Sequence, residues 1–321
     1  MQDYCSSVGS DHRRKYGQFF TPAPVASFMC EWALAGGATE LYDPAVGLGA
    51  FFSAAQQMGA RTTLAGAEID AVILEHFRDS QPTAQQAFVR KEDYLLNWGG
   101  QHEAIVCNPP YMRFQNFSGR EAVFACFQNI LGLRLSGYTN SASAFLLKSL
   151  SELPPGGRLA YIMPLEFLNA GYGSIVKSQL LQSGRLKALI RLESEREVFP
   201  DAITSVGIVL VANNQRVEPV NFYTLSDLGQ LPKILSSRPA NCLSSTGLNP
   251  SAKWLSYFET PSDLIDDRNL ISIREYGDFS RGIATGANEF FVMSSSKARQ
   301  LAIPSSALSR CIARSSQVKR C

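Results

Sequence analysis

Two patterns of apolar residues alternate along the chain between about residues 40 and 211. Short runs that are apolar throughout, or at every second position, predict strands, and longer stretches with a 3.6-residue period predict helices. The predicted strands are Glu40–Asp43, Thr63–Ile69, Ala87–Lys91, Ala104–Cys107, Arg158–Met163, Ala188–Leu192 and Val206–Val211. The predicted helices are Pro24–Ala35, Ala50–Met58, Ala71–Asp79, Ser143–Leu153 and Tyr172–Gln182. This alternation predicts an α/β fold: a doubly wound, mostly parallel seven-stranded sheet with helices on both faces.

The regular pattern weakens after Ala212, where turn-forming residues replace the apolar runs. The segments Ser236–Pro239 and Ser244–Gly247 are rich in Ser, Pro and Gly, which favour turns and linkers. The residues that follow are few for an independent core. We therefore expect a first domain over 1–225, a linker over 226–245 and, over 246–321, the start of a second, truncated domain.

Composition narrows the class of protein. Of the 321 residues, 45% are hydrophobic and 18% charged, as is usual for a folded soluble protein. No stretch approaches the roughly 20 apolar residues that cross a bilayer, and Met1–Ser10 lacks the apolar core of a signal peptide. The seven cysteines form no C-x-x-C pair, and the three histidines are scattered. We expect a cytoplasmic protein with no membrane segment, no metal site and no disulfide bonds.

The distribution of charge is more informative than the net charge of +2. From Phe291 onward every charged residue is a lysine or an arginine. Such a stretch would suit contacts with the phosphates of a nucleic acid. A basic tail that is simply solvated is an equally good interpretation of this segment.

A glycine-rich loop follows the first predicted strand in the sequence DPAVGLGAF, residues 43–51. Gly47 and Gly49 allow the backbone to approach a ligand closely, and the helix that starts here favours an anionic group at its N-terminus. A dinucleotide-binding loop would need a third glycine at position 52, which is Phe52. The loop therefore indicates a ligand other than a dinucleotide, and a purely structural turn is the alternative.

Acidic residues stand at the ends of the next two predicted strands. Glu68 could accept hydrogen bonds from both hydroxyls of a ribose, and Asp93 from an adenine amine. Tyr94 or Ile69 could cover the face of the adenine ring. Each acid alone is more often a solvated strand end, but together with the glycine loop they favour an adenosine-containing ligand.

The fourth predicted strand runs into the tetrapeptide NPPY, residues 108–111. An aromatic amine is a poor nucleophile because its lone pair is delocalised into the ring. The side-chain oxygen of Asn108 and the carbonyl of Pro109 could accept both amine hydrogens and turn the lone pair towards an electrophile. The prolines stiffen the loop, and Tyr111 could stack on a base that has swung out of a duplex. A surface turn is the alternative.

These motifs together resemble the N6-adenine DNA methyltransferases of restriction-modification systems, in the TaqI-like branch with gamma-type motif order. The resemblance covers about residues 15–211 and includes the segment GQFFTP, residues 17–22, ahead of the glycine loop. It implies a class I methyltransferase fold, S-adenosyl-L-methionine as the cofactor and double-stranded DNA as the substrate.

The resemblance also assigns roles to individual residues. The implied catalytic residues are Asn108, Pro109, Pro110 and Tyr111, and the implied stacking residues for the target base are Tyr111 and Phe199. The implied cofactor-binding residues are Phe20, Thr21, Asp43, Ala45, Gly47, Gly49, Glu68, Ile69, Asp93, Tyr94 and Phe145. No metal is implied.

Residues 281–291 look like the start of the family's target recognition domain. That domain should continue much further, so we expect either a missing C-terminal domain or a separate recognition subunit. The chain alone should then bind DNA weakly and with little sequence preference.

Two other functions remain open from the sequence. Protein methyltransferases that act on a glutamine amide also carry NPPY, although they lack the GQFFTP segment. A catalytically weak remnant of the same fold that binds DNA or a partner is the second alternative.

Overall fold

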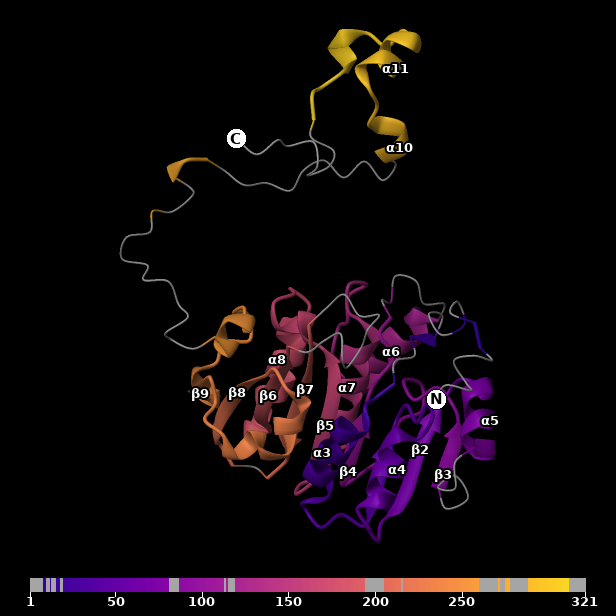
Figure 1. The fold of residues 1–321 in the computed structure, drawn as a ribbon, viewed down its shortest axis with the longest axis vertical. Helices are drawn as coiled ribbons and strands as arrows, with labels where there is room; N and C mark the ends of the chain where they lie inside the picture. The colour runs from indigo at the N-terminus through magenta and orange to yellow at the C-terminus, as the bar shows by residue number, and fades with distance from the viewer. Residues whose placement is uncertain are drawn as a thin grey trace. The chain divides into compact units, whose positions relative to one another are not determined.

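Figure 1 shows the chain as a computed structural model. The structure describes residues 8–9, 12, 16–17, 20–80, 87–112, 114, 119–193, 205–214, 216–259, 271, 275–277 and 288–311. The chain forms two compact units, Met1–Leu264 and Ile265–Cys321.

Within the described residues, the first unit contains one sheet of nine strands in the order β3-β2-β1-β4-β5-β7-β6-β8-β9. Neighbouring strands from β3 to β5 are parallel, β7 lies antiparallel between β5 and β6, β8 is parallel to β6, and β9 is antiparallel to β8. The strands are β1 (Glu40–Asp43), β2 (Thr63–Glu68), β3 (Ala87–Lys91), β4 (Ala104–Cys107), β5 (Arg158–Pro164), β6 (Leu186–Leu192), β7 (Val206–Ala212), β8 (Pro219–Leu225) and β9 (Asn241–Ser244). The change of order at β1 and β4 places their carboxyl ends at a switch point, where open α/β sheets bind ligands.

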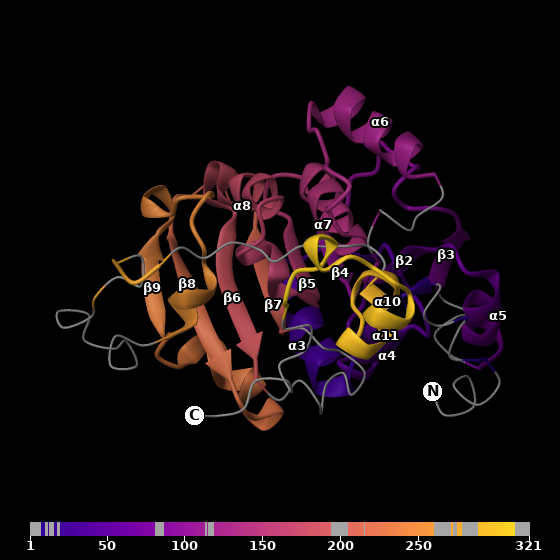
Figure 2. The same ribbon diagram turned by 90° about the horizontal axis from the view of Figure 1, so that it is seen from above.

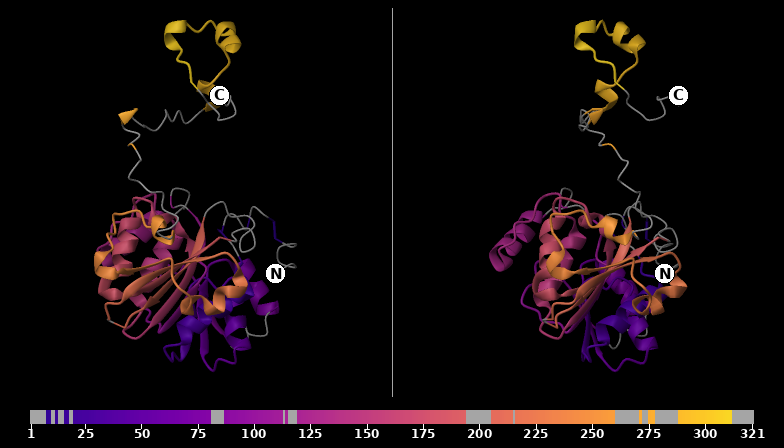
Figure 3. Two further views of the ribbon diagram at one scale, coloured as in Figure 1. Left: turned by 60° about the vertical axis from the view of Figure 1, so that its left-hand side comes forward. Right: turned by 90° about the vertical axis from the view of Figure 1, so that its left-hand side faces the viewer.

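Helices cover both faces of this sheet (Figures 2 and 3). Successive residues of a strand point to opposite faces, so Ala104 and Val106 join one core while Ile105 and Cys107 join the other. The first core contains α3 (Ala23–Leu34), α4 (Ala50–Gln57), α5 (Ala71–Ser80) and the 3₁₀ segment η5 (Leu228–Ser236). The second contains α6 (Arg120–Leu131), α7 (Ser141–Glu152) and α8 (Gly173–Leu181). The doubly wound α/β fold is therefore confirmed.

All seven predicted strands are present, and the sheet is extended by two more. In β8 the alternating residues Val220 and Phe222 are fully buried in the core that contains α7, a period-2 pattern that the sequence analysis did not identify. Helix α6 was also not predicted. Helix α7 begins at Ser141 rather than Ser143, because the Asn140 side chain accepts a hydrogen bond from the Ser143 amide at 2.8 Å and caps the helix.

Residues 226–245, predicted as a linker, instead form η5 and β9 in the first unit. Leu231 and Ile234 are buried in the core, and β9 pairs with β8. Beyond them, Trp254 is fully buried, and its ring lies 6.3 Å from that of Phe222. The Ser, Pro and Gly residues in this region therefore separate short packed elements.

The described part of the second unit consists of α10 (Asn288–Phe291), α11 (Ser295–Gln300) and the 3₁₀ segment η10 (Ser305–Ala307). The side chain of Ser294 caps α11 by accepting a hydrogen bond from the Lys297 amide at 3.3 Å. Phe290 and Phe291 are largely exposed. Most of the predicted start of a recognition domain, 281–287, and the last ten residues lie outside the described residues.

Candidate active site

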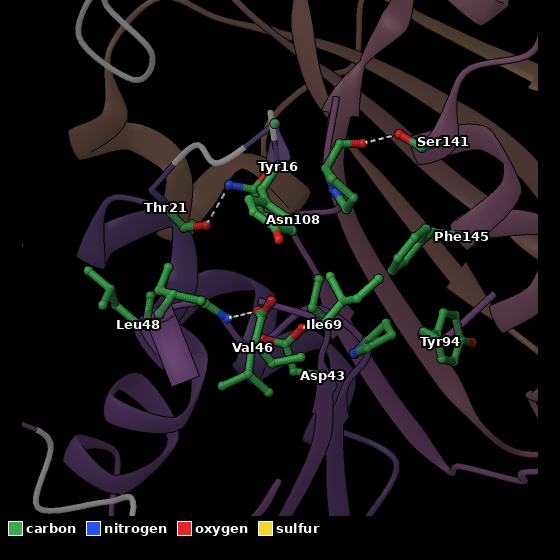
Figure 4. Close-up of a pocket in the computed structure, with 18 of the residues that line it drawn as sticks. Tyr16, Thr21, Asp43, Val46, Leu48, Ile69, Tyr94, Asn108, Ser141 and Phe145 are labelled. Atoms are coloured by element: carbon green, nitrogen blue, oxygen red, sulfur yellow. Dashed lines mark hydrogen bonds between the residues drawn. The ribbon is translucent and has the colours of Figure 1, made fainter. Parts of the chain in front are cut away.

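A cavity of about 210 Å³ opens at the carboxyl ends of β1, β2 and β4 (Figure 4). Its walls come from the loops that follow these strands and β3, together with α7 and residues 16, 17, 20 and 21. Of the residues predicted for the site, those that line it are Phe20, Thr21, Asp43, Ala45, Gly47, Glu68, Ile69, Asp93, Tyr94, Asn108, Pro110 and Phe145. The sheet topology thus brings segments far apart in sequence around one space.

The two glycines of the loop after β1, Gly47 and Gly49, have different structural roles. Both have positive φ, +53° at Gly47 and +74° at Gly49. A Cβ on Gly49 would lie 2.3 Å from the ring of Phe77, whereas one on Gly47 would meet nothing closer than 3.8 Å. Gly47 lines the cavity, and Gly49, predicted as a cofactor-binding residue, instead permits packing against α5.

Glu68 joins the end of β2 to the glycine loop. Its carboxylate accepts hydrogen bonds from the amides of Gly47 and Asp70, each at 2.9 Å. The side chain is almost fully buried, and this burial raises the pKa of the Glu68 carboxyl, against the opposing effect of the two amides. Each oxygen keeps further acceptor capacity for a ligand.

Asp43 is the most deeply buried acid of the cavity, with 1% of its surface exposed. One carboxylate oxygen accepts a hydrogen bond from the Ala45 amide at 3.0 Å, and the other has no partner among the described residues. Burial, and to a lesser degree the charge of Glu68, raise the pKa of Asp43 to about 8, although the Ala45 amide opposes the shift. Because it is buried and one of its oxygens has no partner in the described part of the chain, the Asp43 carboxyl can bind a cation or accept a hydrogen bond from a ligand.

Asp93 follows β3 and is the third acid of the cavity. It accepts a hydrogen bond from the Leu95 amide at 3.0 Å. Partial burial raises the pKa of Asp93, and the positive charge of Lys148 opposes that shift. Its carboxylate can therefore receive a donor from a ligand in the cavity.

Two aromatic rings form an apolar wall beside these acids. The rings of Phe145, from α7, and Tyr94 lie 5.2 Å apart and are tilted by 42°. Ile69 lines the same cavity, and 47% of its surface is exposed. A flat aromatic ligand between these residues would be contacted on its faces, and Asp93 could accept a hydrogen bond from its polar edge.

A buried ionic network behind the cavity fixes the position of Tyr94. The hydroxyl of Tyr94 donates to Glu152 at 2.6 Å and is 2.8 Å from that of Ser149. The ammonium of Lys148 forms an ion pair with Glu152 and lies 3.6 Å from the centre of the Tyr94 ring. The sequence analysis missed this network, although two charged residues four positions apart in an apolar helix were a usable signal.

The NPPY loop forms the wall opposite the acids. The Asn108 amide group donates to the Thr21 hydroxyl at 3.1 Å, and the Tyr111 amide donates to the Gly17 carbonyl at 3.4 Å. Gly17 has φ of +60°, and a Cβ there would lie 2.8 Å from the Tyr111 nitrogen. The GQFFTP segment thus contacts the NPPY loop directly as well as lining the cavity.

Two residues of the loop do not line the cavity. Pro109 is buried beside it. The hydroxyl of Tyr111 donates to the carbonyl of Ile162 on β5 at 3.2 Å, and burial raises the pKa of this phenol. The predicted stacking of Tyr111 on a target base therefore stays a prediction, and Phe199 lies outside the described residues.

Elsewhere in the described parts of the chain, no helix is long and apolar enough to cross a membrane. Over the same residues, no three His, Cys, Asp or Glu side chains are grouped so as to hold a metal ion.

The fold is that of the class I S-adenosylmethionine-dependent methyltransferases. A protein assigned to this class from Listeria monocytogenes superimposes with a TM-score of 0.56 at 16% identity, over 71% of this chain and 70% of that one. A modification subunit ascribed to a type I restriction enzyme of Vibrio vulnificus YJ016 gives 0.58 at 16% identity, over 78% and 63%.

Sequence comparison identifies the family. Residues 51–199 match the Eco57I restriction-modification methylases, and residues 252–321 match the C-terminal domain of Type II methyltransferase M.Eco57I. Type II methyltransferase M.AccI of Acinetobacter calcoaceticus is 35% identical over 99% of this chain. The chain belongs to the restriction-modification methyltransferases, and it spans 60% of the length of M.AccI.

Proposed function

We propose that this chain transfers a methyl group from S-adenosylmethionine to the N6 amine of adenine in double-stranded DNA, as the modification enzyme of a restriction-modification system. The observation that carries the proposal is the position of Asn108. Its side chain lines the same cavity as the acids Asp43, Glu68 and Asp93, with its amide group anchored on Thr21. The proposed cofactor site and one acceptor for the target amine, Asn108, therefore share one space, and Pro109 is the next residue along the loop.

The cavity suits S-adenosylmethionine in shape and in chemistry. Glu68 would accept from the ribose hydroxyls and Asp93 from the adenine amine, while Phe145 and Ile69 would contact the adenine ring. The free oxygen of Asp43 would accept from the ammonium of the methionine part or lie near the positive sulfur. The buried acids Asp43 and Glu68 and the partly buried Asp93 match a ligand with two positive centres.

When bound, the cofactor supplies an electrophilic methyl group. The residues of the chain act on the acceptor amine: the Asn108 side-chain oxygen and the Pro109 carbonyl accept its two hydrogens. These contacts strengthen as the nitrogen gains positive character, so they stabilise the transition state more than the bound substrate. The methylated amine then releases one proton to solvent or to a hydrogen-bonded acceptor.

Recognition of a DNA sequence requires contacts with base edges, which the catalytic unit does not provide by itself. We propose that the region that reads DNA starts within residues 246–321, beyond the part that packs on the first unit, and is completed by further chain or by a recognition subunit. The match of residues 252–321 to a methyltransferase C-terminal domain supports this. We further propose that the protein acts in the cytoplasm, where its DNA substrate lies.

The test is transfer of a labelled methyl group from S-adenosylmethionine to duplex DNA and, in parallel, to protein. We expect the label in DNA, recovered as N6-methyladenine after digestion to nucleosides, and its loss in Asn108→Ala. Label in cytosine would contradict the choice of base. Label in a protein glutamine would replace the proposal with the amide methyltransferase alternative.

A further inference from the structure

The first residue of α7, Ser141, lies against the NPPY loop (Figure 4). Its hydroxyl donates to the carbonyl of Pro110 and accepts a hydrogen bond from the Met112 amide at 3.0 Å. Its own amide donates to the Met112 carbonyl at 2.8 Å. Ser141 is 3% exposed and lines the cavity, so these contacts are shielded from water.

These contacts limit the remaining freedom of the loop. Proline rings fix φ at both Pro109 and Pro110, so the direction of the Pro109 carbonyl depends mainly on the two ψ angles. Asn108 is held by Thr21 before the prolines, and the Tyr111 amide bonds to the Gly17 carbonyl after them. The Pro110 carbonyl, which Ser141 contacts, and the Tyr111 amide belong to the same peptide group, so both polar atoms of the peptide that follows the prolines are held.

A second serine on the same helix provides a matched comparison. Ser143 is fully buried, and its hydroxyl has no hydrogen-bond partner among the described residues. Removing that hydroxyl would break no contact with the loop, whereas removing the Ser141 hydroxyl would leave the Met112 amide and the Pro110 carbonyl without this partner. Two buried serines two positions apart therefore differ in one respect, contact with the NPPY loop.

We propose that Ser141 is a positioning residue for methyl transfer, which holds the Pro109 carbonyl and Asn108 in the geometry that accepts the hydrogens of the target amine. The proposal rests on the proposed function. It assigns to Ser141 an effect on the rate of transfer and not on cofactor affinity, because the hydrogen bonds of its hydroxyl are with the loop and not with the acids.

The experiment compares the full chain with Ser141→Ala and Ser143→Ala. Single-turnover methyl transfer to an adenine-rich duplex gives the rate, calorimetry gives the affinity for S-adenosylmethionine, and amide hydrogen exchange reports on Tyr111 and Met112. In Ser141→Ala we expect transfer to slow by about tenfold to a hundredfold, because small misplacements of reacting groups cost rates of this order. Exchange at Met112 should rise on the order of fivefold or more, and cofactor affinity should stay within about twofold. Ser143→Ala should match the original chain in all three.

Three outcomes decide the matter. Faster exchange with an unchanged rate in Ser141→Ala would overturn the positioning role, because the loop would then be free to move without consequence for transfer. An equal loss in Ser143→Ala would also overturn it, because the effect would then be general to this helix. Failure of the proposed function has a different signature: no label in adenine for the unchanged chain, or none lost in Asn108→Ala, while the exchange data still report whether Ser141 holds the loop.

Discussion

The two walls of the cavity are built on different physical principles. The wall that follows β1, β2 and β3 carries Asp43, Glu68 and Asp93, whose pKa values are all raised, mainly by burial. The opposite wall carries the neutral groups of Asn108 and Ser141, which are fixed by hydrogen bonds to neighbouring segments. The first wall would therefore act on a ligand through its ionisable groups, and the second through the fixed positions of its neutral groups.

This contrast predicts a separation of binding from rate. Buried acids gain most when positive charge or donors arrive, so they should control affinity for the cofactor and make it depend on pH. Neutral acceptors that are held in place gain most in the transition state, so they should control the rate with little dependence on pH. Variants on the two walls should therefore differ in kind.

The largest expected effect is that of Asn108→Ala on the neutral wall. Loss of one acceptor that acts on developing charge should reduce the rate of methyl transfer by about a hundredfold to a thousandfold. Affinity for S-adenosylmethionine should stay within about threefold. Asn97→Ala is a suitable control, because Asn97 is an exposed asparagine that bonds to Glu92. Equal losses of rate and affinity would place Asn108 in the cofactor site and remove the distinction between the walls.

Glu68→Ala on the charged wall should show the reverse. Hydrogen bonds to a charged group are worth about 1.5–3 kcal/mol, so affinity for S-adenosylmethionine should fall by about tenfold or more, while the rate at saturating cofactor changes little. Glu75→Ala, on the exposed side of α5, serves as the control. If calorimetry shows unchanged affinity, Glu68 only supports the glycine loop.

The pH dependence of cofactor binding sharpens the contrast further. The pKa of Asp43 is raised to about 8 from its usual value of 3.8. A positively charged ligand favours the ionised form of Asp43, so below about pH 8 binding of the ligand must release a proton from this acid. The affinity should therefore fall by up to about tenfold for each unit by which the pH is lowered. Titrations at pH 6, 7 and 8 measure this slope, which Asp43→Asn should abolish. A slope that survives in Asp43→Asn would assign it to another group.

The same shift makes a statement about stability. Between about pH 4 and pH 8 the folded chain holds a proton on Asp43 that the unfolded chain has released, as follows from the raised pKa. The contribution of Asp43 to stability in the absence of ligand therefore falls as the pH rises through this window and is constant above it. Thermal unfolding should show this slope in the original chain and a flatter profile in Asp43→Asn.

The smallest expected effect is that of Gly47→Ala. An added Cβ has room, but the positive φ of +53° costs an alanine about 1 kcal/mol. Gly49→Ala should cost more, because its Cβ would overlap the Phe77 ring. Denaturant unfolding of the two variants compares them directly. Similar losses would mean that backbone strain, and not packing against α5, sets the requirement for glycine at position 49.

Much of the fold follows from local sequence signals. Strands such as β5 and β7 are continuous apolar runs, as expected for strands that are buried on both faces of a sheet, so their existence could be predicted. β8 was missed although Val220 and Phe222 alternate on one face, because this alternation is short and the strand is stabilised by pairing with β6 and β9. The turn residues near Ser236 were misleading for the same reason, since packing and not local preference holds η5 and β9 in the first unit.

The candidate site, like the fold, could be predicted only in part from the sequence. The acids Asp43, Glu68 and Asp93 stand at strand ends, and a parallel sheet must gather its carboxyl ends, so their approach to one another could be expected. Their roles towards the cofactor stay predictions. The contact of Ser141 with Pro110 depends on how α7 packs against the NPPY loop, which no local pattern encodes.

The loop that carries Asn108 is held in place by segments that are distant from it in sequence. Its supports come from Gly17 and Thr21, near the start of the chain, and from Ser141, about thirty residues further on. Contacts between segments so distant in sequence each close a long stretch of chain, which costs conformational entropy. A molecule that has formed its local helices but not these contacts would therefore lack the geometry that we propose for methyl transfer. The proposed activity thus depends on the correct packing of distant parts of the chain as well as on the residues that would touch the substrate.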